Sequence, residues 1–202
     1  MELGAIDNNA TINEIRFISQ IYRETNDAAY KESVRREIGF LLEAQYETCA
    51  WQQVYPARGL PGDGVYYSNY ATFNDNAMIN VLELIDDIAN RAYPFDADIV
   101  DEAAVEALKQ AKVLGIEYIL NAQIEADGIL TAWCAQHDTF TYEPMRARAY
   151  EHPSISGSES LGIVRYLMAQ PNQTEEIKRA VKGALEWFDA VKLEGIRYVS
   201  EA

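Results

Sequence analysis

The feature that most constrains this chain of 202 residues is a series of helical segments that repeats along the sequence. Six stretches carry apolar residues at the spacing of one buried helix face, as at Val34, Ile38 and Leu41. No strand pattern competes with this periodicity, so the sequence predicts an all-α fold. We expect the helices over residues 10–24, 28–46, 74–91, 99–124, 158–170 and 173–194.

These segments repeat as pairs. The stretch NATINEI (9–15) at the start of the first segment matches NAMINVL (76–82) at the start of the third. Their partner segments also end alike, in FLLEAQ (40–45) and YILNAQ (118–123). Each unit therefore reads as a helical hairpin, and the first two hairpins are related copies.

A third and weaker copy runs from GSESLGIVRYL (157–167) to GALEWFD (183–189). Hairpins that repeat in this way stack side by side and bury a continuous core between them. We therefore expect a single domain over residues 1–202, built as an (α/α)3 toroid or barrel. In such a toroid, the loops at one rim come from equivalent positions of each copy and converge in space.

Clusters of acids and amides occupy those equivalent positions. Residues 7–9 read DNN, residues 74–76 read NDN, and Ser158 with Glu159 stand at the start of the third copy. Asp and Asn at helix starts commonly cap the free N–H groups of the first turn. Their carboxylate and amide oxygens are also the donors that calcium prefers. Both interpretations remain open from the residues alone.

The overall charge restricts the class of partner. A formal net charge of −15 at pH 7 argues against nucleic acid or an anionic membrane surface, because both attract positively charged proteins. No apolar stretch approaches the ~20 residues that cross a bilayer. Surface charges are screened beyond about 8 Å at physiological salt. A local group of arginines or a bound divalent cation can therefore still attract an acidic ligand.

Two loops that follow helix pairs are rich in aromatic and polar residues. They read CAWQQVYPARG (49–59) and LTAWCAQHDTFTYEP (130–144). Aromatic rings beside amides suit stacking on sugar faces with hydrogen bonds to hydroxyls, so Trp51, Tyr55 and Trp133 are candidates for a sugar-binding cleft. The alternative is that the two tryptophans fill the ends of the barrel.

Ionisable groups in the second loop and just after it offer further candidates. His137 with Asp138 could act as a base and its orienting partner, or could form a structural hydrogen bond. Downstream, EPMRARAYEHP (143–153) carries Arg146 and Arg148, whose guanidinium groups match carboxylates in a bidentate manner. The arginines could form internal salt bridges or bind an anionic ligand.

The sequence resembles the family ten pectate lyases nearly from end to end. The resemblance is carried by AIDNNATINEIRF, WQQVYPARG, TFNDNAMINVL, GIEYILNAQI, TAWCAQHD, TYEPMRARAYEHPSISGSESLGI and GALEWFDAVKLEGIRYV. It implies an (α/α)3 toroid and an enzyme that cleaves polygalacturonate by anti-β-elimination. It also implies Ca²⁺ as cofactor and a product with a 4,5-unsaturated end.

The family motifs assign roles to individual residues. By resemblance, Asp7 and Asn8 in the D-N-x-A-T stretch and Asp75 in the N-D-x-A-M stretch are expected to hold calcium. Arg148 corresponds to the proposed base that removes the C5 proton, with Arg146 close by as a substrate-binding residue. An arginine base is chemically demanding because its pKa normally exceeds 12. The alternative is that Arg148 holds the substrate and another group takes the proton.

The resemblance also carries expectations about the whole protein. Family members usually have segments before the first motif and after the last, so we expect a truncated catalytic module. We further expect a monomer that is secreted or periplasmic, although this chain begins without a signal peptide. Two rival functions remain: a catalytically impaired pectate-binding fragment, and an α/α-barrel glycoside hydrolase that uses paired carboxylates.

Overall fold

The six predicted helices are all present in the computed structural model, which describes residues 4–59, 66–196 and 199. Each lies within three residues of its expected bounds. The all-α fold class is confirmed, and none of the described helices combines the length and apolar character that a membrane span requires. The helices are α1 (Ala10–Thr25), α2 (Ala28–Ala44), α3 (Ala77–Ala89), α4 (Glu102–Asn121), α5 (Gly157–Ala169) and α6 (Glu175–Val191).

Five of the six helices start in one of two ways. Three helices begin after a side chain that accepts a backbone hydrogen bond from the first turn: Asp27 before α2, Asp101 before α4 and Thr174 before α6. Such caps satisfy N–H groups that lack a partner inside the helix. Helices α1 and α3 instead follow short 3-10 turns with left-handed residues. Helix α3 therefore starts three residues later than its periodicity predicts.

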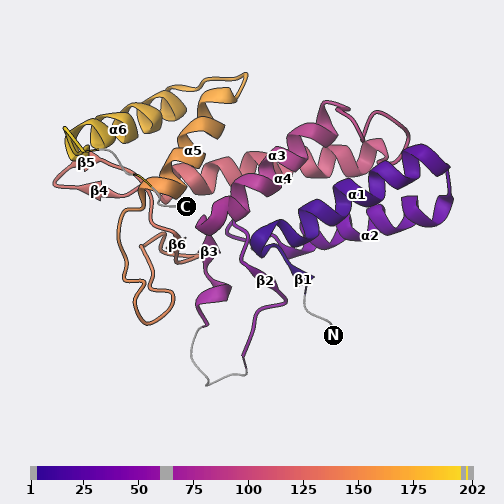
Figure 1. Ribbon diagram of the computed structural model, residues 1–202, viewed down its shortest axis with the longest axis horizontal. Coiled ribbons are helices and arrows are strands. Elements are labelled where there is room, and N and C mark those ends of the chain that lie inside the picture. Colours follow the sequence, from indigo (N-terminus) through magenta and orange to yellow (C-terminus); the bar gives the residue numbers. More distant parts are fainter. Residues whose placement is uncertain (1–3, 60–65, 197–198, 200–202) are drawn as a thin grey trace.

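The helices pack as three hairpins, α1 with α2, α3 with α4, and α5 with α6. The middle hairpin joins the other two, because α3 contacts both α1 and α5 while α4 contacts both α2 and α6. Figure 1 shows the first and third hairpins at opposite ends of the molecule. The repeat of hairpins is therefore confirmed, but the described residues form an open arc and do not close into a barrel.

Short antiparallel strands connect the loops at one side of the arc. Strand β1 (Gly4–Ala5) pairs with β2 (Val54–Tyr55), and β3 (Ala71–Thr72) pairs with β6 (Gln136–His137). An isolated bridge between Gln52 and Ala71 links these two pairs. A separate pair, β4 (Glu125–Ala126) with β5 (Ile129–Leu130), lies beside the third hairpin (Figure 1). Each of the first two pairs therefore joins loops within one repeat, and the bridge joins the first repeat to the second.

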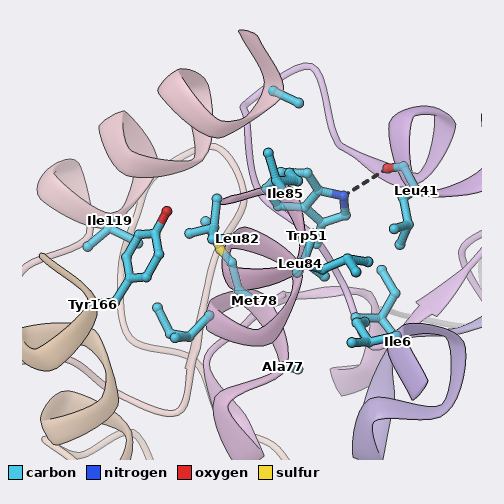
Figure 2. Packing of buried hydrophobic residues seen from close by; sticks show 14 of the residues in the cluster. Ile6, Leu41, Trp51, Ala77, Met78, Leu82, Leu84, Ile85, Ile119 and Tyr166 are labelled. Atoms are coloured by element: carbon cyan, nitrogen blue, oxygen red, sulfur yellow. Dashed lines mark hydrogen bonds between the residues drawn. The ribbon is translucent and has the colours of Figure 1, made fainter. Parts of the chain in front are cut away.

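The two loop tryptophans are the largest side chains of the core. Trp51 and Trp133 are fully buried, and their indole N–H groups donate to the carbonyls of Leu41 (2.9 Å) and Ile119 (2.8 Å) near the ends of the preceding helices. Figure 2 shows Trp51 among the side chains of α3, with its N–H directed at the Leu41 carbonyl. A Cβ at Gly115 would lie 2.9 Å from the Trp51 ring, so α4 needs a glycine there.

One carboxylate in the first hairpin lies in an unfavourable environment. Burial raises the pKa of Glu37 on α2 to about 7, and the nearby charge of Glu14 on α1 adds to the effect while Arg36 opposes it. Its Oε2 atom is buried without a hydrogen-bond partner among the described residues. A carboxyl whose pKa is higher in the folded state binds more protons there, so its contribution to stability falls between about pH 4.5 and pH 7.

We predict that Glu37→Gln stabilises the protein at alkaline pH. Because the variant removes a charge that is costly to bury, the free energy of unfolding at pH 8 should rise by about 1 kcal/mol, allowing for partial solvent exposure. At pH 4, where the carboxyl is protonated in both states, the gain should disappear. Urea denaturation at both pH values measures this, with exposed Glu24→Gln on α1 as the control. An equal gain at both pH values would contradict the prediction.

Candidate active site

The acid–amide clusters form two turns with the same backbone conformation. The 3-10 turn η1 (Asp7–Asn9) precedes α1, and η3 (Asn74–Asn76) precedes α3. The last two residues of each turn are left-handed, with φ of 53° and 60° in η1 and of 52° and 58° in η3. Asn and Asp adopt this conformation more readily than other non-glycine residues. The clusters are thus explained in part by the backbone.

The carboxylates in these turns are not neutralised. Asp7 Oδ1 accepts a hydrogen bond from the N–H of Asn8 (3.1 Å), and Asp75 Oδ2 accepts one from the side-chain amide of Asn74 (2.6 Å). Neither aspartate forms an ion pair with a residue that the structure describes. Asp75 is exposed and Asp7 is half-buried. Each therefore retains oxygen lone pairs that can bind a cation.

The two turns lie at the same end of neighbouring helices. Turn η1 contacts α3, and η3 contacts α5, while Figure 1 shows α1, α3 and α5 all beginning on the side where β1, β3 and β6 lie. The approach of η3 to α5 is very close, because a Cβ at Gly162 would lie 2.0 Å from Asn76 Oδ1. The expected convergence of the three repeats at one rim is therefore supported by these contacts.

The side chains in these turns have the chemistry of ligands for an oxygen-binding cation, the class to which the expected calcium belongs. The expected ligands Asp7, Asn8 and Asp75 offer carboxylate and amide oxygens, which are hard donors. Within residues 4–59, 66–196 and 199, no group of three or more His, Cys, Asp and Glu side chains is placed to hold a metal. Of the three expected ligands, only Asp7 and Asp75 belong to these four residue types, and the third ligand, Asn8, would bind through its amide oxygen. The expected set fits an oxygen-binding cation and not a thiolate- or imidazole-binding one.

Arg148 lies in a tight turn and binds Glu151. The carboxylate of Glu151 accepts hydrogen bonds from Arg148 Nε (2.9 and 3.0 Å), from Nη2 and from the backbone N–H of Arg148 (3.0 Å). Arg146 supports the same turn, because its Nη2 donates to the carbonyl of Ala149 (2.6 Å). The two arginines therefore have different environments, and Arg146 is engaged with its own loop.

The surroundings of Arg148 favour its charged form. Its pKa is raised, mainly by the hydrogen bonds and charge of Glu151, with smaller contributions from Tyr67 and Asp7. The contribution of Asp7 indicates that the turn before α1 lies within electrostatic range of Arg148. Arg148 is thus held as a cation in range of one candidate metal ligand, Asp7, and a guanidinium of this kind can bind a carboxylate.

A polar cavity of about 390 Å³ lies beside this turn. Tyr150, at the tip of the turn, is 94% exposed, and Glu159 accepts a hydrogen bond from Ser156 at the start of α5. Sequence reasoning placed Glu159 at the rim but assigned no role to Asn74 or Glu151. Residues that line the cavity include Asn74, Gln136, Tyr150, Glu151, His152 and Glu159.

The aromatic residues expected to stack on sugars are not among those that line this cavity. Trp51 and Trp133 are fully buried, so neither can present a ring face to a ligand, and the expectation that they bind substrate is wrong. They fill the ends of the hairpins instead. Tyr55 is half-buried, packs edge-on against Phe40 with ring centroids 6.0 Å apart, and donates to Glu43 (3.2 Å).

His137 is a structural residue. It is fully buried, and hydrogen bonds occupy both ring nitrogens, since Nδ1 donates to the Tyr142 carbonyl (2.8 Å) and Nε2 accepts from the N–H of Cys134 (3.0 Å). Burial lowers its pKa, so the ring stays neutral. Asp138 does not orient it, because its carboxylate accepts from backbone N–H groups of its own loop. The expectation of a substrate-binding or basic His137 is therefore wrong.

Comparison with known proteins gives a consistent picture. The sequence model of the family described as pectic acid lyase matches residues 1–202. Two solved structures have a TM-score of 0.85 and 44% identity over 93% of this chain. They are a family 10 polysaccharide lyase from Cellvibrio cellulosa and a mutant of such a lyase in complex with trigalacturonic acid. This chain spans only 56% and 57% of their respective lengths. No curated protein sequence gave a match.

We predict that Gly162→Ala disturbs the turn before α3. The new Cβ would overlap Asn76 Oδ1, and the Asn76 side chain is too short to move clear without shifting η3. The free energy of unfolding should fall by about 2 kcal/mol, and amide hydrogen exchange in η3 should accelerate. Urea denaturation and exchange measurements check both effects.

Gly39→Ala is the matched control, because its Cβ meets nothing within 4 Å on an exposed position of α2. That substitution should stabilise the helix, by up to about 1 kcal/mol. Equal stability of the two variants would contradict the close approach of η3 to α5.

Proposed function

Because this chain belongs to the pectic acid lyase family, we propose that it binds polygalacturonate and cleaves it by calcium-dependent anti-β-elimination. The products would be 4,5-unsaturated oligogalacturonates. The observation that carries the proposal is that Asp7 lies within electrostatic range of the cationic Arg148, while Asp75 stands in the equivalent turn of the next repeat. The trigalacturonic acid bound to the similar Cellvibrio lyase supports an acidic sugar as the substrate.

Asp7, Asn8 and Asp75 would hold the calcium ion. Their oxygens remain accessible at the surface of the rim, and calcium accepts six to eight oxygen ligands, which leaves positions for a uronate. When bound, the ion would attract the carboxylate of the sugar and stabilise the negative charge that develops on it. A cation at this place also explains how a protein with a net charge of −15 could bind an acidic polymer.

Arg148 would act on the same reacting uronate. In the elimination, the C5–H bond breaks, its electron pair forms the C4–C5 double bond, and the C4–O bond breaks. The departing oxygen then takes a proton from solvent. We propose that Arg148 orients the carboxylate of this sugar and is the candidate acceptor of the C5 proton. Because its surroundings favour the cation, the neutral form needed for that step would become more abundant at alkaline pH.

A second candidate function is binding of pectate without turnover. The observation that favours it is length, because this chain spans little more than half of the solved lyase chains that it matches. Residues needed for cleavage could lie in the part that the match does not cover. Such a protein would bind polygalacturonate with calcium but release no unsaturated product at any pH.

We predict that calcium and Asp75 are both required for cleavage. With polygalacturonate and calcium, the protein should release products with the ultraviolet absorbance of an unsaturated uronide. A chelator should abolish this release, and Asp75→Ala should lower it by about 100-fold and weaken calcium binding in calorimetry. New reducing ends without ultraviolet absorbance would instead indicate a hydrolase.

Asp127→Ala is the matched control. Asp127 has nearly the same left-handed φ as Asp75, 51° against 52°, but lies in the exposed loop between β4 and β5. It should suffer similar backbone strain without loss of activity. Cleavage that resists both the chelator and Asp75→Ala would disprove the metal site.

A further inference from the structure

We propose that Glu151 is a positioning residue, which fixes the orientation of the Arg148 guanidinium toward the substrate. This inference rests on the proposed lyase function and assigns a role to a residue that lies within a quoted motif but received no role from it. Glu151 follows Arg148 by three positions in the loop between β6 and α5. It bonds to the arginine, and no hydrogen bond or ion pair joins it to Asp7, Asn8 or Asp75 among the described residues, so it would act through Arg148.

The contact is unusually complete for two neighbouring surface residues. Glu151 binds the side edge of the guanidinium, where Nε lies 2.9 and 3.0 Å from its two oxygens and Nη2 also donates to it. The same carboxylate accepts from the backbone N–H of Arg148 at 3.0 Å. In turn, the N–H of Glu151 donates to the carbonyl of Arg148 (3.0 Å). The Glu151 side chain and the backbone of the turn therefore hold each other in one conformation.

A comparison within the protein shows what is special about this pair. Arg35 and Glu32 on α2 are also three positions apart and exposed, but they share a single hydrogen bond of 3.0 Å through Nη1. Exposed ion pairs of that kind add little to folding stability. The side chains of Arg148 and Glu151 are 67% and 42% exposed, so their multiple bonds also do little for the fold. Their effect is to immobilise an otherwise flexible arginine.

The locked arginine keeps one edge available. Arg148 Nη1 makes no hydrogen bond to any residue in the described part of the chain, whereas the edge formed by Nε and Nη2 is occupied by Glu151. Glu151 itself lines the polar cavity together with Asn74 and Glu159. Arg148 does not itself line this cavity, but its bonds to Glu151 tie the guanidinium to a residue of the cavity wall and hold the free edge in one place. Preorganisation of this kind removes an entropic cost of binding.

Of the groups around Arg148, Glu151 has the largest effect on its pKa. The titratable groups that face the guanidinium are Glu151 in the same turn, Tyr67 in the 3-10 turn η2 (Tyr67–Asn69) and Asp7 in η1. Of these, Glu151 contributes most to raising the pKa of Arg148. Removal of its charge should therefore lower that pKa. A role confined to loop stability would not produce this change.

The test compares Glu151→Gln, Glu151→Asp and the matched control Glu32→Gln with the unaltered protein. Glu151→Gln keeps the shape of the side chain but loses its charge, so KM for polygalacturonate should rise about tenfold. The pH at which kcat/KM reaches half its maximum should move to lower values. Glu151→Asp retains the charge and should keep the original pH profile. Glu32→Gln should change neither quantity.

Binding measurements keep the inference separate from the proposed function. Trigalacturonate affinity in calcium should fall about tenfold in Glu151→Gln, and circular dichroism should confirm that the variant is folded. Unaltered protein that binds but releases no unsaturated product would contradict the lyase function and leave this affinity difference as support for Glu151. Equal affinity, equal KM and superimposed pH profiles of Glu151→Gln and the unaltered protein would overturn the role of Glu151, as would absence of binding by the unaltered protein.

Discussion

Packing on both sides of helix α3 is the constraint on which the rest of the structure depends. Eight of its residues are buried, and it contacts α1, α4 and α5. A helix that is apolar on most of its surface has to be enclosed by other elements. The first and third hairpins enclose it from opposite sides (Figure 1). The turn that carries Asp75 immediately precedes this helix, so the helix with the most buried residues positions a candidate metal ligand.

The repeat pattern predicted most of the fold because periodicity reports directly on burial. Six helices and their pairing follow from apolar spacing and from the similarity of residues 9–15 to 76–82. The pattern does not say whether the hairpins close into a ring, since that depends on the angle between successive hairpins. It also missed the left-handed residues of η1 and η3, because Asn and Asp suit a cap, a turn and a metal site equally well.

The site was harder to predict, because residue type does not reveal the direction of a side chain. Trp51 and His137 stand in polar loops whose composition suits sugar binding, yet both point inward and bond to backbone groups. Glu151 shows the opposite case. A glutamate three residues after an arginine is common in loops and carries no signal by itself. Only the folded turn shows that it occupies a whole edge of the guanidinium.

The candidate metal ligands come from separate hairpins, with Asp7 and Asn8 before α1 and Asp75 before α3. A metal ion bound by all three residues would link the first repeat to the second. Because repeat proteins are held together mainly by contacts between adjacent units, this link would stabilise the interface between the two hairpins. An ion that binds only the folded state would stabilise both hairpins by mass action, and the two hairpins would then unfold together.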